Sequence, residues 1–116
     1  MIAGIGTDII EIRRVARAAR NERFLRRCFS DAELQGSAAS LAGNFAAKEA
    51  VVKALGCGFA GFWPRDVAIL RDARGAPYVS LSGEAKRLAA ELGSPRILVT
   101  LAHCGEYAVA YAVSSF

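Results

Sequence analysis

The sequence predicts an α+β fold, with one domain over residues 1–116 and a mainly antiparallel sheet covered by helices. Two C-terminal segments alternate in side-chain character on either side of a turn at 103–106, which is typical of an antiparallel hairpin. A run of strong helix formers at 38–55 ends at Gly56, as expected for a helix that covers the sheet. With 116 residues, 53% of them hydrophobic, the chain can bury one core.

Hydrophobic periodicity and turn residues give the expected boundaries of the elements. In chain order these are a strand at 2–7, a helix at about 9–20, a short helical piece through Arg27, a helical turn at 31–35, the main helix at 38–55, a glycine-rich loop at 56–61, hairpin arms at 65–71 and 78–81, a helix at 83–92, and strands at 97–101 and 107–113.

Polar residues mark the expected helix starts. Asp8 and Glu11 have the spacing of a capping box, which predicts that the first helix begins between them. Ser30 or Asp31 is a candidate N-cap for the helical turn, and Ser82 is one for the helix that follows it at 83.

Three cysteines, Cys28, Cys57 and Cys104, lack the spacing of a zinc site and leave one unpaired. A disulfide framework is therefore not expected, and a reducing cytosol fits best. The first residues lack a basic leader and carry acidic side chains, so we expect no signal peptide. No apolar run reaches membrane-spanning length, so we expect a soluble, cytoplasmic protein.

The net charge of +4 is unevenly distributed. Between residues 13 and 27 only Glu22 opposes the arginines, which are Arg13, Arg14, Arg17, Arg20, Arg23, Arg26 and Arg27. Such a patch indicates an acidic partner, which could be a protein, a nucleic acid or a phosphate-bearing ligand.

A continuous helix would gather part of this patch on one face, with Phe24 among the arginines. The members of that stripe are Arg13, Arg17, Arg20 and Arg27. A cationic stripe with an aromatic anchor suits an acidic amphipathic helix, although a solvated arginine face is the simpler alternative. No recognised nucleic-acid motif accompanies the patch.

The main helix carries the most informative charges of the chain. Glu49 and Lys53 share one face of it, and Lys48 flanks them. A carboxylate of this kind binds metal, and ammonium groups suit phosphate. The expected partner of Glu49 is Asp8. The simpler alternatives are a helix cap at Asp8 and a solvated pair of Glu49 with Lys53.

Two motifs stand out together: Gly6 and Asp8 at the end of the first strand, and the run Phe-Ala-Ala-Lys-Glu-Ala…Lys-Ala at 45–54. Both resemble signatures of the acyl-carrier-protein synthase branch of the 4′-phosphopantetheinyl transferases. The segments Phe29–Leu34, Asp72–Tyr78 and Glu106–Ala110 agree as well, so the resemblance covers nearly the whole chain.

The resemblance implies the transfer of 4′-phosphopantetheine from coenzyme A to a serine of an acidic acyl carrier protein. It further implies a homotrimer with active sites between subunits, acting without nucleic acid or membrane. Asp8 and Glu49 are then the catalytic residues and the Mg²⁺ ligands. The implied coenzyme A contacts are Lys48, Lys53, Thr100 and His103. The backbone of Gly56 and Gly58 can also approach a phosphate or adenine closely, although a glycine that ends a helix is as often a simple stop. The expected carrier contacts are Arg14, from the resemblance, and Arg13, Arg17, Arg20 and Phe24, from the arginine stripe.

The chain departs from the family pattern at three places. Asn44 stands where an arginine is common, Ala102 removes a hydroxyl from the Ser-x-Ser-His run while Thr100 keeps one, and the stretch from 34 to 41 is short. Asn44 and Ala102 keep open the alternative of a non-catalytic module that binds carrier protein or coenzyme A. The arginine patch keeps open an arginine-rich RNA-binding domain.

Overall fold

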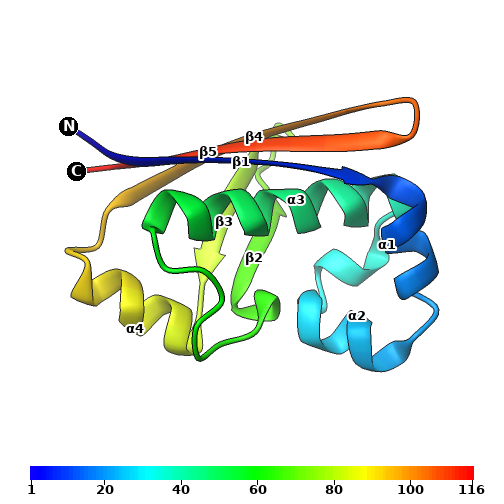
Figure 1. The fold of residues 1–116 in the computed structure, drawn as a ribbon, viewed down its shortest axis with the longest axis horizontal. Coiled ribbons are helices and arrows are strands. Elements are labelled where there is room, and N and C mark those ends of the chain that lie inside the picture. The colour runs from blue at the N-terminus through cyan, green and yellow to red at the C-terminus, as the bar shows by residue number, and fades with distance from the viewer.

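The computed structural model describes residues 1–116 and has the expected α+β architecture (Figure 1). A three-stranded antiparallel sheet has the order β1-β5-β4, and β2 and β3 form a separate hairpin. In chain order the elements are β1 (Ile2–Glu11), α1 (Ile12–Ala18), α2 (Glu22–Cys28), the 3-10 turn η1 (Glu33–Gln35), α3 (Ala38–Leu55), the 3-10 turn η2 (Pro64–Asp66), β2 (Val67–Arg71), β3 (Pro77–Leu81), α4 (Gly83–Glu91), β4 (Arg96–Cys104) and β5 (Tyr107–Ser115).

Helix α3 is the centre of the molecule. Figure 1 shows the three-stranded sheet extended along one side of α3, with the β2–β3 hairpin on another side and α1 and α2 gathered near one end. Most residues of α3 are buried, as is typical of a helix with protein on several sides. None of the helices combines the length and the apolar character needed to cross a membrane.

Two glycines of β1 let α3 lie directly on the strand. A Cβ atom added at Gly4 would lie 2.0 Å from the carbonyl oxygen of Ala54, and one added at Gly6 would lie 2.0 Å from that of Ala50. No side chain fits in that space, so backbone meets backbone here. The contact fixes which residues of β1 face α3.

Small and β-branched side chains fill the core between α3 and its neighbours. Ala46, Ala50 and Val51 of α3 pack with Val67 of β2 and Ala110 of β5 in one cluster. A second cluster joins the start of α3 to the two short helices and contains Val15, Cys28, Phe29, Leu41, Ala42 and Ala108. The second cluster holds both arginine-bearing helices against α3.

The predicted capping box is wrong. Strand β1 continues through Asp8 to Glu11, and α1 begins at Ile12 without a side-chain cap from Glu11. The reason is long-range pairing: β1 aligns with β5 as far as Glu11 opposite Tyr107. Ser82 does lie at the N-cap position of α4, but its side chain makes no capping hydrogen bond either.

The predicted continuous arginine helix is also interrupted. Helix α1 ends at Ala18, and Asn21 starts α2 by accepting hydrogen bonds from the backbone N–H groups of Arg23 (2.9 Å) and Phe24 (3.3 Å). Arg27 therefore leaves the stripe, and its guanidinium lies 4.5 Å from the ring centre of Trp63.

Candidate functional site

Asp8 lies where β1 crosses α3. Strand alternation puts it on the same face as Gly4 and Gly6, toward the helix. Its Oδ1 is 3.6 Å from Nζ of Lys53, which also donates a hydrogen bond of 2.9 Å to the carbonyl oxygen of Thr7. The close contact of β1 with α3 thus brings a carboxylate and an ammonium group together.

Glu49 lies one helical turn before Lys53 and completes this group. Burial raises the pKa of Glu49, the negative charge of Asp8 raises it further, and Lys53 lowers it. Burial likewise raises the pKa of Asp8 despite the opposing effect of Lys53. Two neighbouring, partly buried carboxylates destabilise each other as anions, and a bound cation relieves that repulsion.

The donor set suits a hard divalent cation. No group of three or more His, Cys, Asp and Glu side chains surrounds a common point, so the pair stands without a third protein ligand of these types. Magnesium is commonly held by one or two carboxylates, with water and substrate phosphates at its remaining positions. The residues present therefore fit a magnesium ion that is shared with a phosphate-bearing ligand.

The glycine-rich loop begins where α3 ends. Gly56 has a φ of 74°, and the N–H groups of Gly56 and Cys57 donate to the carbonyl oxygens of Lys53 (3.0 Å) and Val52 (3.1 Å). This pair of bonds is a Schellman motif, so Gly56 has a structural task as a helix stop. A Cβ added at Gly56 or Gly58 would meet no atom within 4 Å, so the backbone there is open to a ligand.

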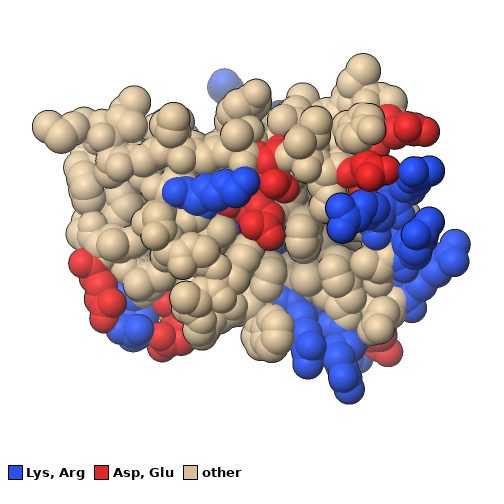
Figure 2. Space-filling model, in the orientation of Figure 1, with Lys and Arg blue, Asp and Glu red and all other residues tan.

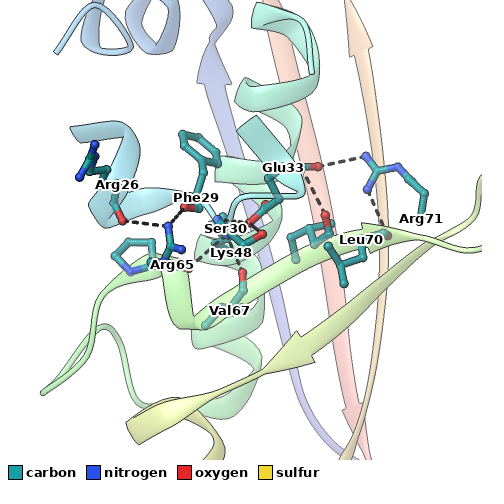
Figure 3. A network of polar contacts seen from close by, with 12 residues as sticks. Arg26, Phe29, Ser30, Glu33, Lys48, Arg65, Val67, Leu70 and Arg71 are labelled. Atoms are coloured by element: carbon teal, nitrogen blue, oxygen red, sulfur yellow. Dashed lines mark hydrogen bonds and ion pairs between the residues drawn. The ribbon is translucent and has the colours of Figure 1, made fainter. Parts of the chain in front are cut away.

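Lys48, which the resemblance implied as a coenzyme A contact, is buried in the structure. Its side chain is fully buried, and Nζ donates to Glu33 Oε1 (2.8 Å), to the carbonyl oxygen of Val67 (2.7 Å) and to that of Pro64 (3.1 Å). Burial lowers the pKa of Lys48, and the carboxylate of Glu33 opposes that effect. All three protons are used, so Lys48 has none to offer a phosphate in this structure (Figure 3).

Sequence reasoning did not single out Glu33, which also accepts from the N–H and the hydroxyl of Ser30, both at 3.0 Å. The predicted N-cap at Ser30 or Asp31 is wrong, because Ala32 stands at the N-cap position of η1 and no side chain caps it. Asp31 instead accepts from Arg65 at 3.2 Å. The only available signal for Glu33 was its place in the family-like segment Phe29–Leu34.

Thr100 and His103 are not brought to Asp8 within one chain. They lie on β4, and β5 separates β4 from β1. Thr100 is opposite Tyr111 on the sheet face that points away from α3, whereas Asp8 points toward α3. His103 is exposed near the end of the β4–β5 hairpin. The predicted site residues thus fall into two separate groups.

The predicted carrier-binding arginines are exposed on α1 and just after it. They are Arg13, Arg14, Arg17 and Arg20, and Arg13 is paired with Glu11 at 3.1 Å. Figure 2 shows basic side chains gathered at the end of the molecule that α1 and α2 form. Phe24 is only partly exposed, because it packs against Phe29 and Phe45 with ring centres 6.0 and 6.1 Å away.

Asn44 is buried, with 4% of its surface exposed, and both ends of its amide are used. Nδ2 donates to the carbonyl oxygen of Ile69 at 3.4 Å, and Oδ1 accepts from Nη2 of Arg71 at 3.0 Å. Nothing in the sequence pattern pointed to Arg71, since its contact with Asn44 joins two elements that are far apart in the chain.

Comparison with known proteins identifies relatives of the whole chain. The family model of the 4′-phosphopantetheinyl transferase superfamily matches residues 4–112. The holo-[acyl-carrier-protein] synthase of Protochlamydia amoebophila is 48% identical over 99% of both chains, and that of Alkaliphilus metalliredigens is 44% identical over 99% of this chain and 100% of its own.

Solved structures show the same fold. The crystal structure of holo-[acyl-carrier-protein] synthase from Neisseria meningitidis superposes with a TM-score of 0.90 at 30% identity and covers 100% of both chains. The Helicobacter pylori synthase in complex with coenzyme A has a TM-score of 0.83 at 30% identity, covering 96% of this chain and 99% of its own. The predicted fold class is confirmed, and the chain belongs to the 4′-phosphopantetheinyl transferase superfamily, in its branch of holo-[acyl-carrier-protein] synthases.

Proposed function

We propose that this protein transfers 4′-phosphopantetheine from coenzyme A to a serine of an apo acyl carrier protein and releases adenosine 3′,5′-bisphosphate. The observation that carries the proposal is the meeting of Asp8, Glu49 and Lys53 at the contact of β1 with α3. Relatives named holo-[acyl-carrier-protein] synthase, and relatives solved with coenzyme A, support this substrate pair.

The reaction forms a bond from the serine oxygen to the phosphorus that carries the pantetheine arm. It breaks the bond from that phosphorus to the oxygen bridging the pyrophosphate, and the serine proton is lost. Charge develops on the phosphate oxygens, so the protein has to orient and neutralise the pyrophosphate. A Mg²⁺ ion held by Asp8 and Glu49 supplies positive charge there when it is bound.

Lys53 is the cation of this chain that is best placed to assist. Its side chain is about half exposed, and it already lies between Asp8 and the carbonyl oxygen of Thr7. A cation at this point attracts a pyrophosphate oxygen and also lowers the pKa of Asp8, against the effect of burial. The open backbone at Gly56 and Gly58 gives a nucleotide room to approach the end of α3.

The exposed arginines of α1 are proposed as the dock for the acidic carrier protein. Arg14, Arg17 and Arg20 have no ion-pair partner in the chain, so their charge is available to a carboxylate on another protein. Phe24 contributes its partly exposed ring beside them.

A homotrimer with sites between subunits is part of the proposal. The sheet face away from α3 is uncovered and apolar, with Ile5, Ile9, Leu98 and Tyr111 exposed by 72, 65, 48 and 56%. A patch of this kind is typical of a protein interface. A neighbouring copy on this face would also let Thr100 reach a site completed by another subunit's residues.

A cytoplasmic location is proposed as well. It is supported by Cys28, Cys57 and Cys104, which are all free thiols, as in proteins of a reducing compartment.

The decisive experiment is mass spectrometry of an apo carrier protein incubated with this protein, coenzyme A and Mg²⁺. A mass gain equal to one phosphopantetheine arm on the serine supports transfer. Tight binding of the carrier or of coenzyme A without a mass gain would instead favour a non-catalytic module. Competition between the carrier protein and RNA for the arginine surface tests the RNA-binding alternative.

A further inference from the structure

A cavity of about 420 Å³ lies between η1, the first half of α3 and the end of β2, and Ser40, Asn44, Arg71 and Tyr78 are among its lining residues. It is separate from the Asp8–Glu49 pair. Asn44 precedes Glu49 by five residues, which on an α-helix is a net rotation of about 140° and a rise of about 7.5 Å. The cavity and the carboxylate pair therefore open on different sides of α3.

Arg71 is the cation of this cavity. Alternation along β2 places it on the same face as Val67 and Ile69, which are buried against α3. The strand ends at Arg71, which Figure 3 shows at the end of β2. Its guanidinium lines the cavity and donates to Asn44. No carboxylate lies within ion-pairing distance of Arg71, and its charge is therefore uncompensated.

Asn44 acts as an anchor for Arg71. Its carbonyl oxygen accepts from Nη2 at 3.0 Å, and its amide nitrogen is held by the carbonyl oxygen of Ile69, so its own side chain has little to offer a ligand. A guanidinium held in one orientation loses less entropy when it binds an anion.

The only acid that lines the cavity is Glu33, and its charge is offset by Lys48 at 2.8 Å. Oε2 of Glu33 is buried and has no hydrogen-bond partner. The cavity thus combines an unpaired cation with one free acceptor. This combination suits a ligand that carries a phosphate group for Arg71 and a hydroxyl or amino donor for Glu33.

We propose that Arg71, oriented by Asn44, binds the 3′-phosphate of coenzyme A. The inference rests on the proposed function. The pyrophosphate is required at Asp8, Glu49 and Lys53, so the phosphate left for this cavity is the one on the ribose. Because the two places face different sides of α3, Arg71 contacts a coenzyme A molecule whose pyrophosphate lies on a neighbouring copy. Arg71 thereby supplies, from β2, the guanidinium that the family pattern commonly has at position 44.

The test compares the affinities of coenzyme A and 3′-dephospho-coenzyme A by calorimetry. We expect Arg71→Ala to lower the affinity for coenzyme A roughly tenfold, because one charge-assisted hydrogen bond is lost. The affinity for 3′-dephospho-coenzyme A should change less than about twofold. Arg74→Ala is the matched control: Arg74 is exposed in the same hairpin, has no ion-pair partner and does not line the cavity. It should leave both affinities unchanged.

An equal loss of affinity for both ligands would place Arg71 at the pyrophosphate and overturn the inference. Unchanged affinity for both ligands would overturn it as well. Arg71→Lys keeps the charge but not the planar fork, and it should retain only part of the preference for coenzyme A. It serves as the test if melting curves show that the Ala variant is unfolded, and an undiminished preference would then overturn the inference.

Asn44→Arg provides an independent test. It would bury a second guanidinium against Arg71, so we expect a lower melting temperature and no gain in coenzyme A affinity. A tighter complex would show that the site lacks its arginine and would contradict the role of Arg71. The mass assay on the unmodified protein separates the two proposals: transfer without any selective effect of Arg71 refutes only this inference, whereas no transfer refutes the proposed function.

Discussion

Nζ of Lys48 lies 2.8 Å from Oε1 of Glu33, with both side chains completely buried. Removing one partner leaves the other charge unpaired in the core, which costs about 3–5 kcal/mol. We therefore expect Lys48→Met and Glu33→Gln to lower the melting temperature strongly. Glu22→Gln, which breaks the exposed pair with Arg26, should change stability by less than about 0.5 kcal/mol. A stable but inactive Lys48→Met protein would show that Lys48 acts on the substrate.

Asp8→Ala and Glu49→Ala should each abolish transfer while the fold persists. Each substitution removes half of the proposed metal site and none of the core clusters. Glu49→Gln keeps the volume but loses the charge, and it should be almost as damaging. Turnover is measured at saturating Mg²⁺ together with the circular dichroism spectrum, and Glu84→Gln on α4 serves as the control. Near-normal turnover of any of the three site variants would remove that residue from the site.

The same pair predicts a pH dependence of stability without metal. Folding raises the pKa of both carboxyls, so the folded chain binds more protons than the unfolded chain and loses stability as the pH rises. The loss begins near their ordinary values of 3.8 for Asp8 and 4.5 for Glu49 and is complete above the raised values.

Mg²⁺ should accordingly raise the melting temperature more at about pH 7 than at about pH 4, where protons compete with the metal. In a chelator, Glu49→Gln should flatten the loss of stability with pH. A magnesium effect of equal size in the wild type and in Glu49→Gln would place the metal elsewhere.

Reversing Arg14 and Arg17 to Glu should impair the use of carrier protein far more than the binding of coenzyme A. The wild-type Michaelis constant for the carrier should rise with salt, because exposed charges are screened beyond about 10 Å at 0.1 M. The variant's constant should rise much less. Arg74→Glu with Lys86→Glu reverses the same number of exposed charges elsewhere and controls for net charge. Parallel salt dependence in the wild type and the α1 variant would exclude this helix as the dock.

Gly6→Ala should destabilise the protein by about 3 kcal/mol or more, because the added Cβ would meet the backbone of α3 at 2.0 Å. Gly105→Ala meets nothing within 4 Å and costs only the strain of its φ of 60°, about 1 kcal/mol. Chemical denaturation of the two variants measures the difference. Equal effects would mean that α3 can move away from β1 at little cost.

Local patterns predicted the elements that are set by local chemistry. The long helix that ends at Gly56, the hairpin around Asp72–Gly75 and the C-terminal hairpin are present close to their expected boundaries. In each of these elements, the residues that determine the local conformation are neighbours in the sequence. Asp8, Glu49 and Lys53 were grouped for a related reason, since helical spacing joins two of them and the family-like motifs join the third.

The sequence-based expectations differ from the structure where contacts between residues far apart in the chain determine the conformation. Asp8 has the right spacing for a cap, but pairing of β1 with β5 keeps it in the strand. Lys48 looks like a surface lysine on spacing alone, and only the folded chain brings Glu33 to it. The hydrogen bonds of Asn21 divide a run of arginines that reads as one helix.

The missing side chains at Gly4 and Gly6 also determine where the protein can adjust when it binds a ligand. With backbone in direct contact with backbone, β1 and α3 cannot slide toward each other, so Asp8 and Glu49 keep a spacing set by the main chain. Adaptation to a nucleotide then falls to side-chain rotation at Lys53 and to the loop after Gly56. Asp8 and Glu49 therefore keep their positions when a ligand binds, and the loop after Gly56 is the part that adapts to it.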